Sequence, residues 1–211
     1  QFATLGYHVI AACRNPESAD QLNALRAGHS NIDLCSLDLS DQASMATLAD
    51  NLQGQAIDLF INNAGVYGAK NASFGNVGGA EWADVLQVNT IAPLLLTQLL
   101  IDNFRQGTDR KLIYISSKVG SIADNQSGNS YQYRSSKSAL NQVVKSLSID
   151  LAQEGFTAVS LHPGWVLTDM GGPNALIDVE TSVTGMLGVI DSLSIEQSGG
   201  FFNYDGTERP W

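Results

Sequence analysis

Short apolar runs alternate with longer segments of helical periodicity along the whole chain. The runs are almost continuously apolar, which is typical of strands that helices cover on both faces. We predict strands at residues 8–13, 32–37, 57–61, 112–115, 157–161 and 201–204. Helices are predicted between them at residues 18–27, 42–52, 81–104, 131–153 and 179–193. This order predicts an α/β fold with a doubly wound, mostly parallel sheet and helices on both of its faces.

Composition and charge narrow the class of protein. The chain has 211 residues, 44% of them hydrophobic, which predicts a single domain over residues 1–211. Acidic residues outnumber basic ones by 21 to 11, so neither nucleic acid nor an anionic membrane is expected as a partner. The longest apolar stretch, residues 91–101, is shorter than the roughly 18 residues of a membrane span. Cys13 and Cys35 are too few for a disulfide framework and lack the spacing of zinc ligands, so we expect no metal site and a cytoplasmic location.

The helix predicted at residues 131–153 carries a candidate acid/base pair, Tyr133 and Lys137. Their spacing of four places them one turn apart on one face, which continues through Leu140 and Val144 toward the sheet. An ammonium beside a phenol stabilises the phenolate and is expected to lower the phenol pKa from about 10. A buried tyrosine next to a lysine that reaches for solvent has the same spacing, and on the spacing alone this structural interpretation is favoured.

Polar and small residues follow several predicted strands, at the sheet edge where doubly wound proteins bind ligands. Ser116 and Ser117 follow one strand, and Asp38 follows another. Turn or cap chemistry explains such residues equally well, and Asp41 is the better candidate for capping the next helix. A run of small residues, Asn62, Asn63, Ala64 and Gly65, likewise follows the strand at 57–61, where a ligand is able to approach the backbone closely.

Asn89 lies inside a predicted helix, four residues before Pro93. Proline has no amide hydrogen, so the Asn89 carbonyl loses its normal helical partner and the helix is expected to bulge there. The freed carbonyl is able to hold a water molecule. A kink that only shapes the packing is the equally weighted alternative.

Taken together, these motifs resemble the ordered set of the short-chain dehydrogenase/reductase family. The resemblance covers essentially the whole chain, and residues 162–170 and 201–206 are most similar to the C-factor-like and sniffer-like carbonyl reductases. It implies a Rossmann-like fold and an oxidoreductase that transfers hydride between a nicotinamide and a small carbonyl or alcohol substrate. The residues that carry it are Asn62 to Gly65, Asn89, Ser117, Tyr133 with Lys137, and Pro163 and Gly164 with Thr168.

The resemblance implies four catalytic roles. Tyr133 exchanges a proton with the substrate oxygen, and Ser117 polarises that oxygen. Lys137 lowers the tyrosine pKa and binds the nicotinamide ribose, while the Asn89 backbone holds a water that connects the lysine to solvent. The interval from Ser117 to Tyr133 is longer than usual in the family, so Ser116 stays open as an alternative.

The resemblance also implies a set of cofactor contacts. Arg14 follows a strand where no carboxylate is present to bind a free ribose 2′-hydroxyl, and an arginine suits a 2′-phosphate, so NADP is preferred to NAD. A solvated charge at a strand end is the alternative for Arg14. The other contacts are Asp38 at the adenine, Asn63, Ala64 and Gly65 at the adenosine ribose, and Tyr133, Lys137, Pro163, Gly164, Val166 and Thr168 around the nicotinamide.

One part of the family pattern is not found in the sequence. The first strand and the glycine-rich phosphate turn of the family correspond to no segment here, although residues 1–6 resemble the end of a helix. In the family that strand lies between those predicted at 8–13 and 57–61. We therefore expect the sequence to be part of a longer enzyme, and we expect weak dinucleotide binding without the turn.

Two further expectations concern partners. Family members commonly assemble through the two long helices, here 81–104 and 131–153, so a homodimer or homotetramer is expected. The segment 169–178 resembles the mobile substrate loop of the family, although a surface loop with incidental apolar residues explains it equally well.

The alternative function is a catalytically inactive or signalling protein that uses the same fold as an interaction module. The presence of Asn89, Ser117, Tyr133 and Lys137 together argues against it.

Overall fold

The computed structural model describes residues 1–69 and 72–211, which form two compact units, residues 1–53 and 54–211. All strand pairs are parallel, and the strands are joined through helices, as expected for a Rossmann-like α/β fold. The pairs form a two-stranded sheet in the first unit and a four-stranded sheet in the second. The number of domains stays a prediction.

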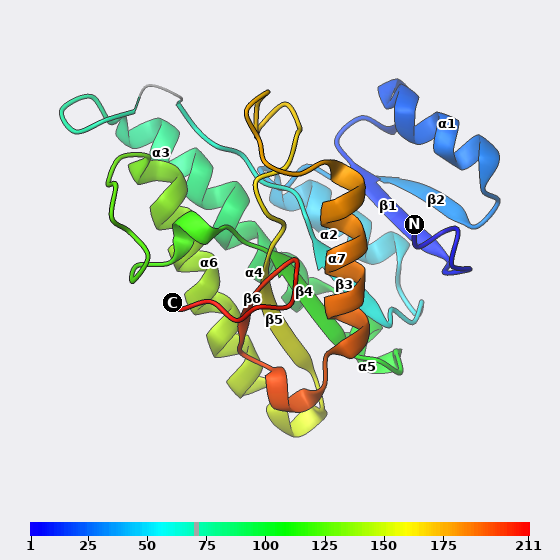
Figure 1. Ribbon diagram of the computed structural model, residues 1–211. Coiled ribbons are helices and arrows are strands. Elements are labelled where there is room, and N and C mark those ends of the chain that lie inside the picture. Colours follow the sequence, from blue (N-terminus) through cyan, green and yellow to red (C-terminus); the bar gives the residue numbers. More distant parts are fainter. Residues whose placement is uncertain (70–71) are drawn as a thin grey trace. The chain divides into compact units, whose positions relative to one another are not determined.

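The first unit contains two parallel strands and two helices (Figure 1). Strand β1 (Val9–Cys13) pairs with β2 (Ile32–Ser36), with Val9 opposite Ile32 and Cys13 opposite Ser36. This register brings Arg14 and the residues after Ser36 to the same edge. The helices are α1 (Asp20–Gly28) and α2 (Gln42–Asn51). The predicted cap is confirmed, because Asp41 Oδ1 accepts a hydrogen bond of 2.9 Å from the Ala43 amide.

The second unit is built on a parallel sheet in the order β3 (Leu59–Asn62), β4 (Lys111–Ile115), β5 (Thr157–His162) and β6 (Phe201–Asn203). Tyr114 and Lys111 of β4 point to opposite faces, because they are three residues apart. The Tyr114 hydroxyl bonds Thr97 of α4 (Ala92–Leu99) at 2.7 Å. Lys111 Nζ donates to the Ile190 carbonyl of α7 (Val179–Ser192) at 2.8 Å. Helices therefore cover both faces of this sheet.

The long helix predicted at 81–104 is divided into several pieces. These are α3 (Gly79–Leu86), a π-helical segment (Gln87–Ile91), α4 and α5 (Ile101–Gln106). The bulge predicted from Pro93 is confirmed, because the Ala92 amide bonds the Gln87 carbonyl five residues back. The prediction of a single uninterrupted helix at 81–104 was wrong. Leu100 ends α4, because its backbone leaves the helical region at φ −98° and ψ 5°.

Helix α6 (Tyr131–Asp150) packs against β5 and matches the predicted helix apart from its last turn, which is a 3-10 turn at Ala152–Glu154 (Figure 1). The predicted inward face is confirmed at Leu140 and Val144, which are both buried. At its start, Ser130 takes up a left-handed conformation with φ 49°.

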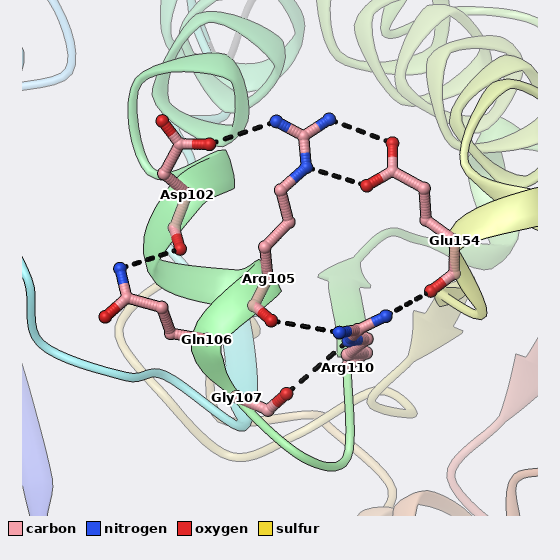
Figure 2. A network of polar contacts seen from close by, with 6 residues as sticks. All are labelled: Asp102, Arg105, Gln106, Gly107, Arg110 and Glu154. Carbon is pink, nitrogen blue, oxygen red and sulfur yellow. Dashed lines mark hydrogen bonds and ion pairs between the residues drawn. The ribbon is translucent and has the colours of Figure 1, made fainter.

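A network of polar contacts lies near the amino ends of β4 and β5 (Figure 2). Arg105 makes two hydrogen bonds to the Glu154 carboxylate, at 2.7 and 2.9 Å, and one to Asp102 at 3.0 Å. Arg110 donates to the backbone carbonyls of Glu154 and Arg105 at 2.6 and 3.0 Å. The network joins α5 to the turn that precedes β5.

No helix in residues 1–69 and 72–211 is long and apolar enough to cross a membrane. Over the same residues, no group of three or more His, Cys, Asp or Glu side chains is arranged to hold a metal ion.

Candidate active site

The first turns of α6 place Tyr133 and Lys137 on one face, as the spacing predicts. Lys137 Nζ lies 5.9 Å from the centroid of the Tyr133 ring. The lysine side chain is buried, and its Nζ donates to the carbonyl of Ile115, the last residue of β4, at 2.8 Å. Burial lowers the pKa of Lys137 to about 8. Helix α6 therefore delivers a desolvated ammonium group to the carboxyl end of β4.

The pKa of Tyr133 differs from the expectation. Burial raises it above the ordinary value of a phenol, a hydrogen bond with Ser117 lowers it, and the neighbouring Tyr67 raises it. The expected lowering by Lys137 was wrong for this structure, because the ammonium is turned to the Ile115 carbonyl and burial of the phenol dominates. Tyr133 is therefore protonated at neutral pH.

Ser117 rather than Ser116 contacts Tyr133. The Ser117 side chain interacts with Tyr133 and lowers its pKa, and Ser117 Oγ accepts a hydrogen bond from the Val119 amide at 3.4 Å. Ser116 is buried and donates to Asn141 Oδ1 at 2.6 Å. The 3-10 turn that follows Ser117 lies directly on α6, because a Cβ on Gly120 would be 2.8 Å from Lys137 Cβ.

Asn89 joins the loop after β3 to α6. Its side chain is fully buried, bonds both the amide and the carbonyl of Val66 at 2.8 Å, and donates to Ser136 Oγ at 3.0 Å. Gly65 lies in the same contact, since a Cβ there would be 3.2 Å from Asn89 Oδ1 and 3.4 Å from Lys137 Nζ. The structure thus brings Gly65, Asn89 and Lys137 together, and a larger residue at 65 would separate them.

The residues predicted around the nicotinamide form a turn after β5. Gly164 has φ +86°, and a Cβ there would be 2.5 Å from Ile177 Cδ1. The Pro163 carbonyl accepts a hydrogen bond from Ser182 of α7 at 2.5 Å. Val166 forms a β-bridge with Ile177, and Thr168 Oγ1 accepts from the Gly171 amide at 3.1 Å. An open cavity of about 440 Å³ lies beside Leu167, Thr168, Asp169, Gly172 and Pro173.

The other predicted cofactor residues lie at the carboxyl ends of strands. Asn63 and Ala64 are exposed directly after β3. In the first unit, Arg14 is exposed directly after β1, and its charge contributes to the low pKa of Asp38. The larger causes of that low pKa are hydrogen bonds from the Ser40 hydroxyl and amide, at 2.6 and 2.9 Å.

Sequence reasoning did not identify Tyr67. Its ring stacks on Tyr133 with centroids 4.8 Å apart, and its hydroxyl shares a 2.8 Å hydrogen bond with Ser130 Oγ. The only available signal was an aromatic residue two places after Gly65 in a long glycine-rich loop. Such a loop does not indicate which helix its side chains contact.

The second unit has donors that suit the nicotinamide half of a dinucleotide. An ammonium carries three N–H donors, and among the described residues Lys137 uses one of them, on the Ile115 carbonyl. Asn62, the last residue of β3, is also buried, and its Nδ2 has no partner among these residues. Hydroxyl-rich ligands satisfy donors of this kind, so the residues present fit a ribose.

Comparisons with known proteins agree with this geometry. The sequence model of the family described as short chain dehydrogenase matches residues 1–175. The C-signal protein of Myxococcus xanthus is 48% identical over 167 residues, which cover 79% of this chain and 100% of that protein. The carbonyl reductase Sniffer of D. melanogaster superposes with a TM-score of 0.92 at 39% identity, covering 97% of this chain and 88% of that one. An NADPH-bound carbonyl reductase from chicken fatty liver has a TM-score of 0.90 at 36% identity, covering 96% of this chain and 87% of that one. The chain belongs to the short chain dehydrogenase family.

Proposed function

We propose that this protein is an NADP-dependent reductase of small carbonyl compounds, with Tyr133 as the general acid. The observation that carries the proposal is the position of the buried Lys137 ammonium, 5.9 Å from the centroid of the Tyr133 ring, beside a phenol whose pKa the Ser117 side chain lowers. Two hydroxyl groups that bind one carbonyl oxygen polarise it and hold it for proton transfer. NADPH, when bound, supplies the hydride. The raised pKa of Tyr133 keeps the phenol protonated, as reduction requires.

In this proposal, Lys137 and Asn89 position the cofactor and return the proton to Tyr133. Two donors of the Lys137 ammonium have no partner among the described residues, and in this proposal they bind the ribose hydroxyls, which places the nicotinamide beside Tyr133. The low pKa of Lys137, about 8, allows it to give up a proton near neutral pH. The π-helical segment around Asn89 leaves backbone carbonyls for a water that returns the proton.

The cofactor assignment rests on Arg14 and on the relatives. Arg14 is assigned to the 2′-phosphate and Asp38 to the adenine, with Asn63, Ala64 and Gly65 at the adenosine ribose. Pro163, Gly164, Val166 and Thr168 are assigned to the nicotinamide. Structures similar to this chain include an NADPH-bound carbonyl reductase and a Burkholderia multivorans protein with bound NADP, the latter at a TM-score of 0.89. These similarities support NADP over NAD.

Assembly and location complete the proposal. We assign the protein to the cytoplasm as a single domain that forms a homodimer or homotetramer through the helical segments 81–104 and 131–153. Exposed apolar side chains on or next to these helices, Ile91, Leu99 and Ile149, support such an interface. Light scattering of the native gene product tests this, and a monomer at all concentrations contradicts it.

The test of the proposed function uses the native gene product. NADPH and NADH are titrated by fluorescence, and loss of NADPH absorbance is followed with a panel of aliphatic and aromatic aldehydes and ketones. We expect NADPH to bind more tightly and the loss to depend on the carbonyl compound. Arg14→Ala is expected to weaken NADPH roughly 10- to 100-fold and to leave NADH unchanged. Equal weakening of both cofactors contradicts the role of Arg14.

The second candidate is a signalling or interaction module. The name of the relative that is 48% identical, C-signal, favours it. The same experiment separates the two, because a module has no need of carbonyl-dependent NADPH oxidation. Absence of turnover with every carbonyl compound favours the module.

A further inference from the structure

Tyr67 is held against Tyr133 by two separate contacts. The two rings stack with an interplanar angle of 28° and a centroid distance of 4.8 Å. The Tyr67 hydroxyl shares a hydrogen bond of 2.8 Å with Ser130 Oγ, just before α6. A stacked pair of rings is favourable beyond the area that it buries, and the second contact fixes the far end of the Tyr67 ring. Tyr67 therefore spans from the start of α6 to the proposed acid.

The backbone on both sides of Tyr67 is fixed without the help of its ring. Before it, both the amide and the carbonyl of Val66 bond the Asn89 side chain at 2.8 Å. After it, the Ala69 amide donates to Gln132 Oε1 at 3.0 Å, and Gln132 Nε2 donates to the Gly78 carbonyl at 3.3 Å. Gln132 is only 2% exposed. The buried side-chain amide of Gln132 on α6, next to Tyr133, thus bonds the backbone of both Ala69 and Gly78.

Gly68 makes this close approach possible. It has φ +83°, and a Cβ there would be 2.6 Å from Gln132 Oε1 and 2.9 Å from Val85 Cγ2. A side chain at this position would push the loop away from α6. The sequence Tyr67-Gly68 therefore places an aromatic ring on the proposed acid and lets the following backbone reach Gln132.

We propose that Tyr67 is a positioning residue for Tyr133, whose ring holds the plane of the Tyr133 ring and keeps water from one of its faces. The proposal rests on the proposed function, since it concerns the same acid. The titratable groups that face Tyr133 are Lys137 on its own helix and Tyr67 on the loop after β3. From the loop after β4 it meets the neutral Ser117 hydroxyl. Removal of Tyr67 exposes the phenol to water, so Tyr133 ionises at lower pH.

The test compares Tyr67→Leu and Tyr67→Phe with the wild type. Tyr131→Leu is the matched control, because Tyr131 lies two residues earlier on α6, on a different face of the helix from Tyr133, and is 38% exposed. Ionisation of Tyr133 is followed by NMR of tyrosines labelled at Cζ, with the signal assigned from Tyr133→Phe. This readout requires neither substrate nor cofactor, so it is independent of the proposed function.

We expect Tyr67→Leu to move the ionisation of Tyr133 to lower pH and to reduce kcat on the order of tenfold, with NADPH affinity unchanged. The alkaline limb of the kcat profile moves in the same direction. Tyr67→Phe retains the stacked ring, so its shift is expected to be smaller, and Tyr131→Leu is expected to give none. An unchanged Tyr133 titration in Tyr67→Leu overturns the proposal, whatever the turnover. If Tyr67→Leu does not fold, Tyr67→Phe provides the test. The proposal is overturned if Tyr133 titrates in Tyr67→Phe as in the wild type while kcat falls more than tenfold.

Discussion

The two ends of the four-stranded sheet differ in how completely their polar groups are paired. At the amino ends of β4 and β5, Arg105 is paired with two carboxylates and Arg110 with three backbone carbonyls (Figure 2). At the carboxyl ends, Lys137 is buried with one hydrogen bond among the described residues. There the buried atoms Asn62 Nδ2 and His162 Nδ1 have no partner in the part of the chain that is described.

The unpaired polar groups at the carboxyl end lower the stability of the fold. Exposed ion pairs such as that of Arg105 contribute little, because solvent screens them. A buried donor without a partner costs about 1–3 kcal/mol, and several such groups at one edge are satisfied when a ligand or ordered water binds there. Burial also lowers the pKa of His162 to about 4, so this edge holds a neutral imidazole as well. The comparison indicates that the amino end supports the fold and the carboxyl end supports chemistry.

The strongest test of this comparison is Tyr133→Phe, which removes one oxygen from the carboxyl end. We expect kcat to fall about 10³-fold, because the general acid is lost. NADPH affinity is expected to remain within a factor of two or so, since the ring and its stacking on Tyr67 are retained. Kinetics with the most active carbonyl compound, together with a fluorescence titration, measure both. A variant that retains its turnover shows that Tyr133 is not the acid.

Ser117→Ala and Ser116→Ala test whether two neighbouring hydroxyls at the carboxyl end have different roles, one in catalysis and one in stability. Ser117→Ala is expected to reduce kcat on the order of 10²-fold with little loss of stability, because its hydroxyl contacts Tyr133. Ser116→Ala removes the bond to Asn141 and is expected to cost about 1–3 kcal/mol of unfolding free energy while kcat is maintained. Steady-state kinetics and urea unfolding of both variants decide the matter. The reverse pattern assigns the catalytic hydroxyl to Ser116.

Local patterns were sufficient for most of the fold and for part of the site. Pro93 predicted the π-helical segment, and the spacing of Tyr133 and Lys137 predicted their common face, because helix geometry depends only on nearby residues. The direction of the Tyr133 pKa could not be predicted, since it depends on burial by segments distant in the sequence. The contact of Tyr67 with Tyr133 joins residues 66 positions apart, and no local pattern encodes it.

Lys137 gives the carboxyl end a pH dependence in the alkaline range. Its folded pKa, about 8, lies below the ordinary lysine value, so between about pH 8 and 10 the unfolded chain binds more protons. Stability from this group therefore rises with pH in that window. We expect the free energy of unfolding of the wild type minus that of Lys137→Met to increase by about 2 kcal/mol from pH 8 to about 9.5. Urea unfolding at several pH values measures it. A difference that stays flat shows that the ammonium retains an ordinary pKa.

The smallest effect is expected at the amino end, from Arg105→Met. This variant removes the pairs with Asp102 and Glu154 and retains much of the apolar stem of the side chain. Because the pairs are exposed, we expect a slight fall in Tm that becomes smaller in high salt, with kcat and the pH profile unchanged. Thermal unfolding at low and high salt, together with kinetics, measures both parts. Arg105→Lys is the matched control that retains the charge but loses the two-pronged contact with Glu154. A loss of turnover in Arg105→Met at full folding would show that the two ends of the sheet are coupled, and their separation into a supporting end and a chemical end would then be wrong.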